Sequence, residues 1–481
     1  MQSKIHLDSF EEYRTSVLNN VRKMLTAFYG EDIPDIARIK KDVKEINAYP
    51  NLSHLKPVSE EQITMLEEGG DTRKAEEAIL AGKVFWEHTA AGEATRLGLG
   101  TKYLLNLKQF AIPSIVKHMR DEAIADLKKQ GLGEKAYVGK VQEIYSEITE
   151  RQVLEDAGCR PDALMNLSLG ARHMLQLAFE IRRIAKNHGQ DPSEVLRRQR
   201  MLIVVNEATA EEIIEGVKQF HYFGFDPEKL YFMVQRAFHG IYVKEGQLFF
   251  DTTTELNKRL HNHGQMMMQK AQEDVIFSVA NGQRRYLSAS DFEGLLQEHD
   301  DYISFNIEDL SYLTHAIDLD GLSLALDLRE QGYNMAMEVV SQNPKKPQKG
   351  GACFYDEVLG RPVMIESNRL RGIQNEEITH LNKNINHYMD PSVCFRELKE
   401  NGLPITFDVK TMLDHNGDPE DYIYPSPVQG DMNFLVTTAF VMRRNVKSIL
   451  AWKSPATTPS ALREMKRQDE QEGFRDFVDA L

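Results

Sequence analysis

Cysteine, tryptophan and long apolar runs are scarce in this sequence. Its 481 residues include two tryptophans and three cysteines, Cys159, Cys353 and Cys394. Because the cysteines are few and far apart, we expect neither a disulfide framework nor a zinc site. No apolar run approaches the ~20 residues of a membrane-spanning helix. The first stretch, MQSKIHLDSFEEYR, lacks the apolar core of a signal peptide, so we expect a cytoplasmic protein with no membrane partner.

Basic residues are outnumbered by acidic ones. The chain has 58 Lys and Arg against 73 Asp and Glu, which gives a net charge of −15. Nucleic acids and anionic membranes attract a positive field, so neither is an expected partner, although a local basic pocket could still bind a nucleotide. A hydrophobic content of 41% and a charged content of 27% are ordinary for a globular protein. The length fits one large α/β domain with additions, or two or three domains.

Strands and helices are expected to alternate through the middle of the chain. Apolar spacing predicts helices over residues 8–80 and 107–198, and Ser59-Glu60-Glu61-Gln62 matches a capping box before another helix. The run MLIVVN, at 201–206, indicates a strand buried on both faces, as in a parallel sheet. The pattern predicts an α/β fold with a mixed, mainly parallel sheet flanked by helices. Further strands are expected at 83–87, 230–235, 275–282 and 302–310, with three consecutive antiparallel strands between 337 and 366.

The stretch HTAAGEATRLGLGTKYLLN, from His88 to Asn106, follows the first of these strands. A strand, a turn of small residues and a helix can hold phosphate, because backbone N–H groups and the amino end of the helix face the anion. The stretch matches neither G-x-x-x-x-G-K-[ST] nor G-x-G-x-x-G, since Leu97 and Tyr103 stand where those patterns need glycine. By itself it fits either a phosphate-binding loop or a small-residue turn between a strand and a helix.

The same stretch resembles the signature L-x-G-G-x-G-T-x-x-G-x-x-x-P-K of nucleotidyltransferases that act on sugar 1-phosphates. The resemblance is strongest to the eukaryotic-type UTP–hexose-1-phosphate uridylyltransferases, among them the UDP-glucose and UDP-N-acetylglucosamine pyrophosphorylases. More stretches resemble motifs of this family in the same order, within about residues 81–420. They are VVNEATAEEI, YFGFDPEKLYFMVQ, ANGQRRY, FNIEDLSYL, MEVVSQNPKKPQKGGACFYDE, LNKNINHY and FDVKTMLDHNG.

The resemblance implies a nucleotidyltransferase fold, GT-A-like and Rossmann-like, and the transfer of a uridylyl group from UTP to a hexose 1-phosphate with release of pyrophosphate. UTP and the sugar phosphate are the expected small-molecule substrates, and Mg²⁺ is the expected cofactor. The particular hexose and the oligomeric state stay open. The expected parts are an N-terminal helical region (1–80), a nucleotidyltransferase-like catalytic domain (81–400) and a small C-terminal α/β section (401–481).

The resemblance also implies phosphate-binding residues at the small-residue turn. Backbone N–H groups of Ala91, Gly92 and Thr95 would line the triphosphate, with Arg96 and Lys102 as counter-charges. The competing interpretations are a solvated loop residue for the arginine and a helix-face residue for the lysine.

Other candidate residues follow from the later motifs. Lys410 matches the family's late lysine, which approaches the α-phosphate, and its alternative is a solvated loop residue. Glu308 stands where the family has a metal-binding aspartate, and Asp309 competes for the same Mg²⁺; the alternative is a carboxylate that caps the next helix. The remaining candidates are Asn206, Glu207, Gly282 and Gln283 for the nucleotide, with a loop cap or an ordinary turn as alternatives, and Glu366, Asn384 and Asn386 for the sugar hydroxyls.

His261 and His263 flank a single asparagine and could form part of a metal site. No third ligand type is evident nearby in the sequence, so a solvated loop is the favoured interpretation.

Several positions depart from the family's pattern. Ala91 and Ala94 stand where the family has glycine, Thr101 precedes Lys102 in place of proline, and a motif resembling F-x-P-V-K is missing near Ser460. The altered glycines, Glu308 and the missing terminal motif favour an alternative function, in which a catalytically weakened relative binds a sugar nucleotide and regulates or scaffolds another process. The other motifs, which are retained, favour an enzyme.

Overall fold

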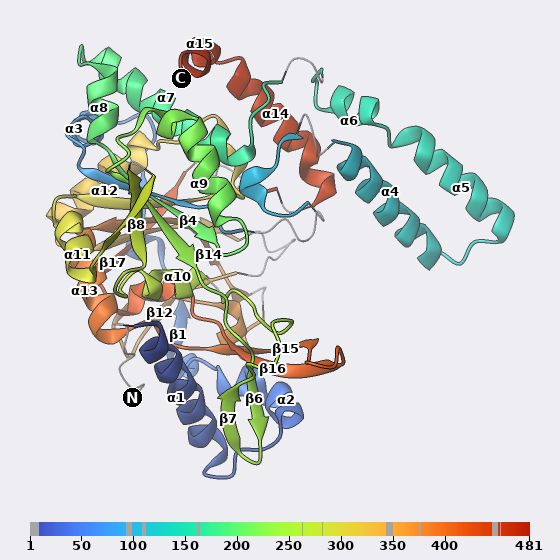
Figure 1. Cartoon of the computed structure of the whole chain (residues 1–481). Helices are drawn as coiled ribbons and strands as arrows, with labels where there is room; N and C mark the ends of the chain where they lie inside the picture. The colour runs from blue at the N-terminus through green and yellow to red at the C-terminus, as the bar shows by residue number, and fades with distance from the viewer. Residues whose placement is uncertain are drawn as a thin grey trace.

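The computed structural model describes residues 9–92, 99–107, 112–160, 164–261, 263–280, 282–342, 350–374, 377–444, 451–452 and 454–481. A large mixed sheet runs through the molecule with helices on its faces, and a smaller sheet lies below it in Figure 1. Within the described residues, no helix combines the length and the apolar character needed to span a membrane.

The large sheet has a parallel centre. β10 (Asp301–Asn306), β3 (Val84–Thr89), β4 (Arg200–Asn206) and β5 (Leu230–Gln235) lie side by side in this order and pair in parallel. The full order is β2-β17-β11-β14-β10-β3-β4-β5-β8-β9, and β12 additionally pairs β1, β13 and β14. The fold class expected from the sequence is therefore confirmed. The other strands are β1 (Leu55–Pro57), β2 (Thr64–Leu66), β8 (Ile276–Ala280), β9 (Gln283–Leu287), β11 (Met335–Ser341), β12 (Ala352–Asp356), β13 (Arg361–Ile365), β14 (His380–Met389) and β17 (Thr438–Arg443).

The smaller sheet is antiparallel and is covered by the first two helices. Its order is β15-β16-β6-β7, and α1 (Phe10–Tyr29) and α2 (Ile36–Ile46) pack against it. Asn47, buried at the end of α2, donates to the carbonyl of Phe407 at 2.7 Å and accepts from its N–H at 3.1 Å, which fixes α2 to β15. The strands are β15 (Phe407–Leu413), β16 (Pro419–Pro425), β6 (Ile241–Lys244) and β7 (Gln247–Phe250).

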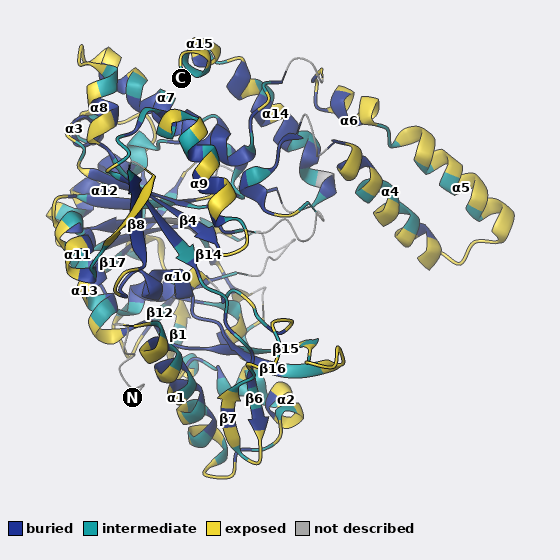
Figure 2. Cartoon of the chain, viewed as in Figure 1, coloured by how far each residue is buried: buried dark blue, intermediate teal, exposed yellow. Residues whose placement is uncertain are grey.

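The remaining helices surround the large sheet, except for one pair that projects from the body in Figure 1 and is mostly exposed in Figure 2. That pair is α4 (Ile112–Lys129) and α5 (Glu134–Glu147). The others are α3 (Arg73–Leu80), α6 (Glu150–Asp156), α7 (Leu169–Asn187), α8 (Pro192–Arg198), α9 (Ala210–Gln219), α10 (His263–Gln269), α11 (Ala289–Gln297), α12 (Leu319–Glu330), α13 (Pro391–Asn401), α14 (Thr458–Asp469) and α15 (Phe474–Asp479).

The strand β4 shows why this sequence forms a buried central strand. Successive side chains of a strand point to opposite faces of the sheet. Ile203 and Val205 accordingly join the apolar cluster on one face, while Leu202 and Val204 join the cluster on the other. All four are fully buried. The run of β-branched residues thus forms a strand that is covered on both faces, as expected from the sequence.

Two local expectations are wrong. The Ser59 capping box starts only the short 3₁₀ turn Glu60–Gln62, because the chain then extends into β2. β11 pairs β14 and β17 instead of β12, so the strands between 337 and 366 are not three consecutive antiparallel neighbours. β2, from the expected N-terminal region, and β17, from the expected C-terminal section, both belong to the large sheet.

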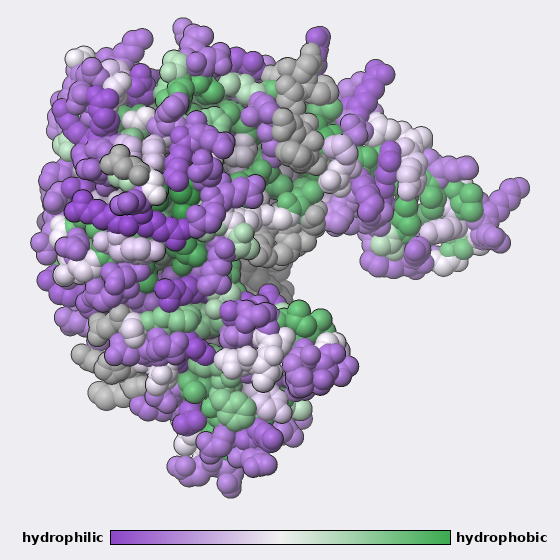
Figure 3. Space-filling view, viewed as in Figure 1, coloured by the Kyte–Doolittle hydropathy of each residue, from purple (hydrophilic) through white to green (hydrophobic). Residues whose placement is uncertain are grey.

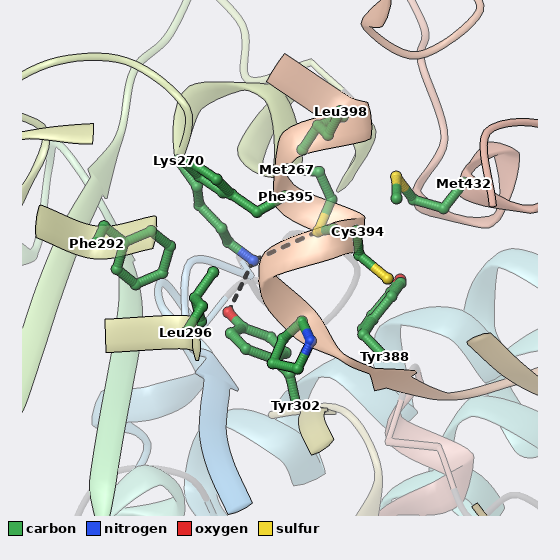
Figure 4. Close-up of a pocket in the computed structure, with 11 residues that line it drawn as sticks. Met267, Lys270, Phe292, Leu296, Tyr302, Tyr388, Cys394, Phe395, Leu398 and Met432 are labelled. Atoms are coloured by element: carbon green, nitrogen blue, oxygen red, sulfur yellow. Dashed lines mark hydrogen bonds between the residues drawn. The ribbon is translucent and has the colours of Figure 1, made fainter. Parts of the chain in front are cut away.

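An apolar cavity of about 30 Å³ lies between the sheet and helices α10, α11 and α13. Such a volume has room for no more than a water molecule or two. Figure 4 shows the Lys270 side chain reaching into it, where its ammonium donates to the Tyr302 hydroxyl at 3.1 Å and to the Met267 sulfur at 3.4 Å. Lys270 also forms an ion pair with Glu87, whose side chain is fully buried. Burial lowers the pKa of Lys270, while the charge of Glu87 opposes that shift. The cavity is part of the core, and its ion pair is structural.

Breaking this pair is expected to be costly. In Lys270→Met, the Glu87 carboxylate stays buried without its counter-charge, so the free energy of unfolding should fall by about 3–5 kcal/mol. The double variant Glu87→Gln/Lys270→Met should recover most of that loss, as measured by urea denaturation.

The matched control is Lys74→Met, which removes an exposed partner of Asp327. Exposed pairs contribute only about 0–1 kcal/mol. Equal losses in the two single variants would contradict the structural role assigned to Lys270.

Candidate functional site

The carboxyl ends of the four central parallel strands meet at one edge of the large sheet. Thr89 in β3 is level with Val204 in β4 and with Asn306 in β10, and Asn206 is level with Gln235 in β5. In α/β sheets, ligands bind outside the carboxyl ends of the strands. The small-residue turn after β3 therefore begins where a ligand is expected.

The turn begins with two alanines whose methyl groups lie in the core. Ala90 is fully buried in the apolar cluster on one face of the sheet, and Ala91 is 7% exposed in the cluster on the other. A Cβ built on Gly92 would touch the Ile307 methyl at 3.5 Å, an ordinary contact, and Gly92 does not have the positive φ that requires glycine. The alanine that replaces a family glycine at 91 thus occupies core space. Thr95 and Arg96 lie outside the described residues.

Asn206 connects the end of β4 to this turn and to the next helix. Its amide donates to the Ala91 carbonyl at 3.1 Å, and its Oδ1 accepts from the N–H and the hydroxyl of Thr209, at 3.0 and 2.9 Å. The side chain is 3% exposed. These bonds give Asn206 the capping and positioning role that was the alternative to nucleotide contact. Its neighbour Glu207 is exposed.

Lys102 and Glu308 come together across this edge. The Lys102 N–H donates to the Gly92 carbonyl at 3.2 Å, which folds the chain back beside the turn. Its side chain is 4% exposed, and its ammonium forms an ion pair with Glu308, whose side chain is 31% exposed. A buried ammonium needs a counter-charge. The structure therefore brings the predicted phosphate-binding lysine and the predicted metal-binding carboxylate into one pair.

The two predicted metal-binding carboxylates differ in what they could bind. Asp309 accepts from the Ser311 N–H at 2.9 Å and from its hydroxyl at 2.7 Å, so it caps the 3₁₀ turn Leu310–Leu313. No cluster of three or more potential metal-binding side chains occurs among the described residues. Mg²⁺ is commonly held by one or two carboxylates together with substrate phosphates. Of the two carboxylates, Glu308 is therefore the one whose position fits a Mg²⁺ ion brought by a nucleotide, while one oxygen of Asp309 is used for capping.

A second group of polar residues lies on the neighbouring strands β11, β14 and β17. Glu338 accepts from the Lys383 ammonium and from the Arg443 guanidinium, both at 2.9 Å. Asn386 is 6% exposed, and its Oδ1 has no hydrogen-bond partner among the described residues. Asn384 lies on the same strand, but its side chain is outside the described part. No sequence motif predicted the pair of Glu338 and Lys383, although both residues lie in stretches that resemble family motifs.

Glu366 lies next to β13, beside Gly351. A Cβ on Gly351 would come within 3.3 Å of its carboxylate. Burial raises the pKa of Glu366, and the charge of Arg369 opposes the shift. Gly351 accepts a backbone hydrogen bond from Asn382 at the start of β14. Glu366 therefore lies near the same end of β14 as Lys383.

Gly282 and Gln283 lie beyond the other end of the parallel strands, near their amino ends. β8 runs antiparallel to β5, with Met233 level with Ile276 and Tyr231 level with Ser278. The turn between β8 and β9 consequently lies at the amino end of β5, away from the turn after β3. These two residues were expected to contact the nucleotide, and the structure does not bring them together with the turn after β3.

Lys410 lies on β15 in the smaller sheet. Its side chain is 43% exposed, and its ammonium is 3.6 Å from the Asp408 carboxylate. Among the described residues, no hydrogen bond or ion pair connects it to Lys102 or Glu308. Lys410 therefore lies among neighbours other than the Lys102–Glu308 pair, including Asp408 and Arg259.

Comparisons with known proteins identify the fold. No protein-family model matches the chain, and no curated protein matches its sequence. Solved structures do match it. The fold is that of the UDP-sugar pyrophosphorylases. The uridine diphosphate N-acetylglucosamine pyrophosphorylase of Trypanosoma brucei, in complex with an inhibitor, has a TM-score of 0.54 and 13% identity over 92% of this chain and 78% of its own. A variant UDP-glucose pyrophosphorylase of Leishmania major, in complex with UDP-glucose, has a TM-score of 0.52 and 14% identity over 91% and 77%.

Beneath the turn of this pyrophosphorylase fold lies a layer of stacked rings. His88 in β3 stacks on Phe305 in β10 at 4.7 Å and lies 5.3 Å from the ring of His173 in α7. Tyr312, from the turn that Asp309 caps, packs on Phe305 at 5.2 Å. Both histidines are fully buried, and burial lowers the pKa of His173 to about 3 and that of His88 well below its usual range. Two neutral imidazoles thus support β3 and β10, the strands that lead to Gly92 and Glu308.

These histidines predict a loss of stability in acid. The pKa of each is lower in the folded than in the unfolded state, so the unfolded state binds more protons as the pH falls below about 6.5. Between pH 7 and pH 5, each buried histidine should lower the free energy of unfolding by about 2 kcal/mol. Between pH 7 and pH 5, the free energy of unfolding of His173→Phe, measured by urea denaturation, should therefore fall by that much less than that of the wild-type protein.

The control for this measurement is His54→Gln, which alters an exposed histidine and should leave the pH effect unchanged. A His173→Phe variant with the wild-type pH dependence would show that His173 titrates normally in the folded protein.

Proposed function

We propose that this protein transfers a uridylyl group from UTP to a hexose 1-phosphate and releases pyrophosphate. The observation that carries the proposal is the ion pair of Lys102 and Glu308, which lies against the turn after β3 in a fold shared with UDP-sugar pyrophosphorylases. The resemblance of the sequence motifs, in the same order, supports the same activity. The 13–14% identity to the matched structures leaves the sugar to be found by experiment.

In this reaction an oxygen of the sugar phosphate attacks the α-phosphorus of UTP. A new P–O bond forms, the bond from the α-phosphorus to the bridging oxygen breaks, and the electron pair leaves with pyrophosphate. The protein need form no covalent bond, because such transfers depend on positioning the reactants and neutralising charge. The backbone of Ala91, Gly92 and Thr95 would bind the triphosphate, and Arg96 and Lys102 would balance its charge.

Other residues have supporting roles in the proposal. Asn206 would hold the turn in place, while Glu366, Asn384 and Asn386 would contact sugar hydroxyls, and Lys410 would contact phosphate from the smaller sheet. Glu308 would hold Mg²⁺ that arrives with the nucleotide, and the ion, when bound, supplies further positive charge at the phosphates.

A second candidate function is sugar-nucleotide binding without turnover. The observation in its favour is that the Lys102 ammonium is already neutralised by Glu308, so an incoming triphosphate must compete with a carboxylate for it.

The test measures pyrophosphate release from UTP with a panel of hexose 1-phosphates. Lys102→Ala removes a charge that would act on the transition state, so kcat/KM should fall by about 10²–10³-fold. Glu308→Ala should also reduce turnover. The matched control is Lys140→Ala, in which the lysine is exposed on the projecting helix α5 and activity should stay at the wild-type level.

Full activity in Lys102→Ala would refute the assigned role. Binding of a UDP-sugar by calorimetry, without turnover of any sugar phosphate tested, would support the second candidate function instead.

A further inference from the structure

A polar cavity of about 210 Å³ lies beside the smaller sheet. One wall is the extended segment that ends at His261 and includes Arg259. The other wall includes Asp408 and Lys410 of β15, the end of β16, and Ser426 directly after β16. Of these residues, only Lys410 was singled out as a phosphate-binding candidate from the sequence.

The cavity lies beyond the carboxyl end of β5. The His261 carbonyl accepts from the Gln235 side chain at 3.5 Å, and its N–H donates to Gln265 at 2.8 Å. Gln235 ends β5 and is level with Asn206 at the end of β4. The cavity therefore lies off the same edge of the large sheet as the turn at Gly92. In Figure 3 the surface is hollowed between the upper body and the lower part, which carries β15 and β16 in Figure 1.

Two cations line this cavity against one carboxylate. The only side-chain hydrogen bond of Arg259 among the described residues goes to the Met412 sulfur at 3.4 Å, and no carboxylate of that part of the chain pairs with it. Lys410 and Asp408 are 3.6 Å apart, and both are about four-tenths exposed. The attraction between the two charges of an exposed ion pair at this distance is weak. On a chain with a net charge of −15, such a local excess of positive charge is unusual and favours an anion.

The walls of the cavity are fixed. The His261 ring stacks on Phe238 at 4.3 Å, and the Tyr424 hydroxyl donates to the Asn257 carbonyl at 2.5 Å. Burial lowers the pKa of His261 to about 3, and the positive charge of Lys410 adds to the shift. The imidazole is thus neutral and adds no charge to the cavity. The expectation that His261 lies in a solvated loop is wrong, since it is 6% exposed.

We propose that this cavity binds a tetrahedral phosphate group, with Arg259 and Lys410 as its cationic partners. The planar guanidinium of arginine can donate two parallel hydrogen bonds to phosphate oxygens, and the lysine ammonium adds a point charge. The phosphate comes either from a phosphomonoester, which in the proposed function is the hexose 1-phosphate, or from free phosphate. Only the first source rests on the proposed function.

Calorimetric titration of the full chain with inorganic phosphate and with glucose 1-phosphate tests this proposal. Arg259→Ala should weaken binding at least tenfold, and Lys410→Ala should weaken it similarly. The matched control is Lys258→Ala, because the adjacent Lys258 ammonium is already 2.7 Å from Glu255; binding should then change by less than twofold. Since Arg259 is exposed, unchanged thermal unfolding should accompany its substitution.

The outcomes separate the two sources of phosphate and the two proposals. Arg259-dependent binding that is tighter for glucose 1-phosphate supports a substrate site, and equal or tighter binding of inorganic phosphate supports a free-phosphate site. No binding by the wild-type protein, or equal binding by Arg259→Ala, overturns the phosphate cavity. Arg259-dependent phosphate binding in a protein that turns over no sugar phosphate overturns the proposed transferase function and leaves the cavity standing.

Discussion

The parallel pairing of β10, β3, β4 and β5 is the constraint on which the candidate site depends. Parallel strands bring their carboxyl ends to one edge, whatever length of chain separates them. This alignment places Gly92, Asn206 and Glu308 close together. The strands are held from both faces, by apolar clusters and by the buried pair of Glu87 and Lys270. The polar residues of the site thus lie at the ends of strands that are buried on both faces.

The ion pair of Lys102 and Glu308 has consequences for both candidate functions. An ammonium that is 4% exposed requires a neutralising partner in the free protein, and Glu308 provides it. Polyphosphate can take over that role, because it carries several negative charges and accepts hydrogen bonds strongly. The pair therefore positions the lysine beside the turn in the free protein. In either proposed function, the same pair would weaken binding, because the carboxylate would compete with the phosphates.

The departures from the family pattern differ in how much they change the candidate site. Ala91 has little effect on the shape of a phosphate loop, because its methyl group lies in the core. The position of Asp309 matters more, since its carboxylate is used to cap a 3₁₀ turn. In the proposed function, Glu308 would then be the protein carboxylate that holds a metal ion brought by a nucleotide. The phosphate cavity at Arg259 would add positive charge on the other side of the hollow, where the smaller sheet lies.

Much of the fold could be predicted from the sequence, because the spacing of apolar residues and the local composition indicate where strands form. The β-branched run of β4 and the strands β3, β5, β8 and β10 lie where the pattern predicts them. The pairing partners could not be read in the same way. β11 pairs β14 and β17, which come from distant parts of the chain, and this choice depends on which apolar faces meet.

The sequence by itself determined the class of fold, the turn after β3 and the candidates Lys102 and Glu308. Only the tertiary structure decided which candidates meet. The antiparallel direction of β8 places Gly282 and Gln283 away from the turn after β3, and the smaller sheet places Lys410 beside Arg259, which no motif had indicated. The physical reason is that charge pairing and burial are properties of residues in contact, and those contacts join strands and loops far apart in the chain.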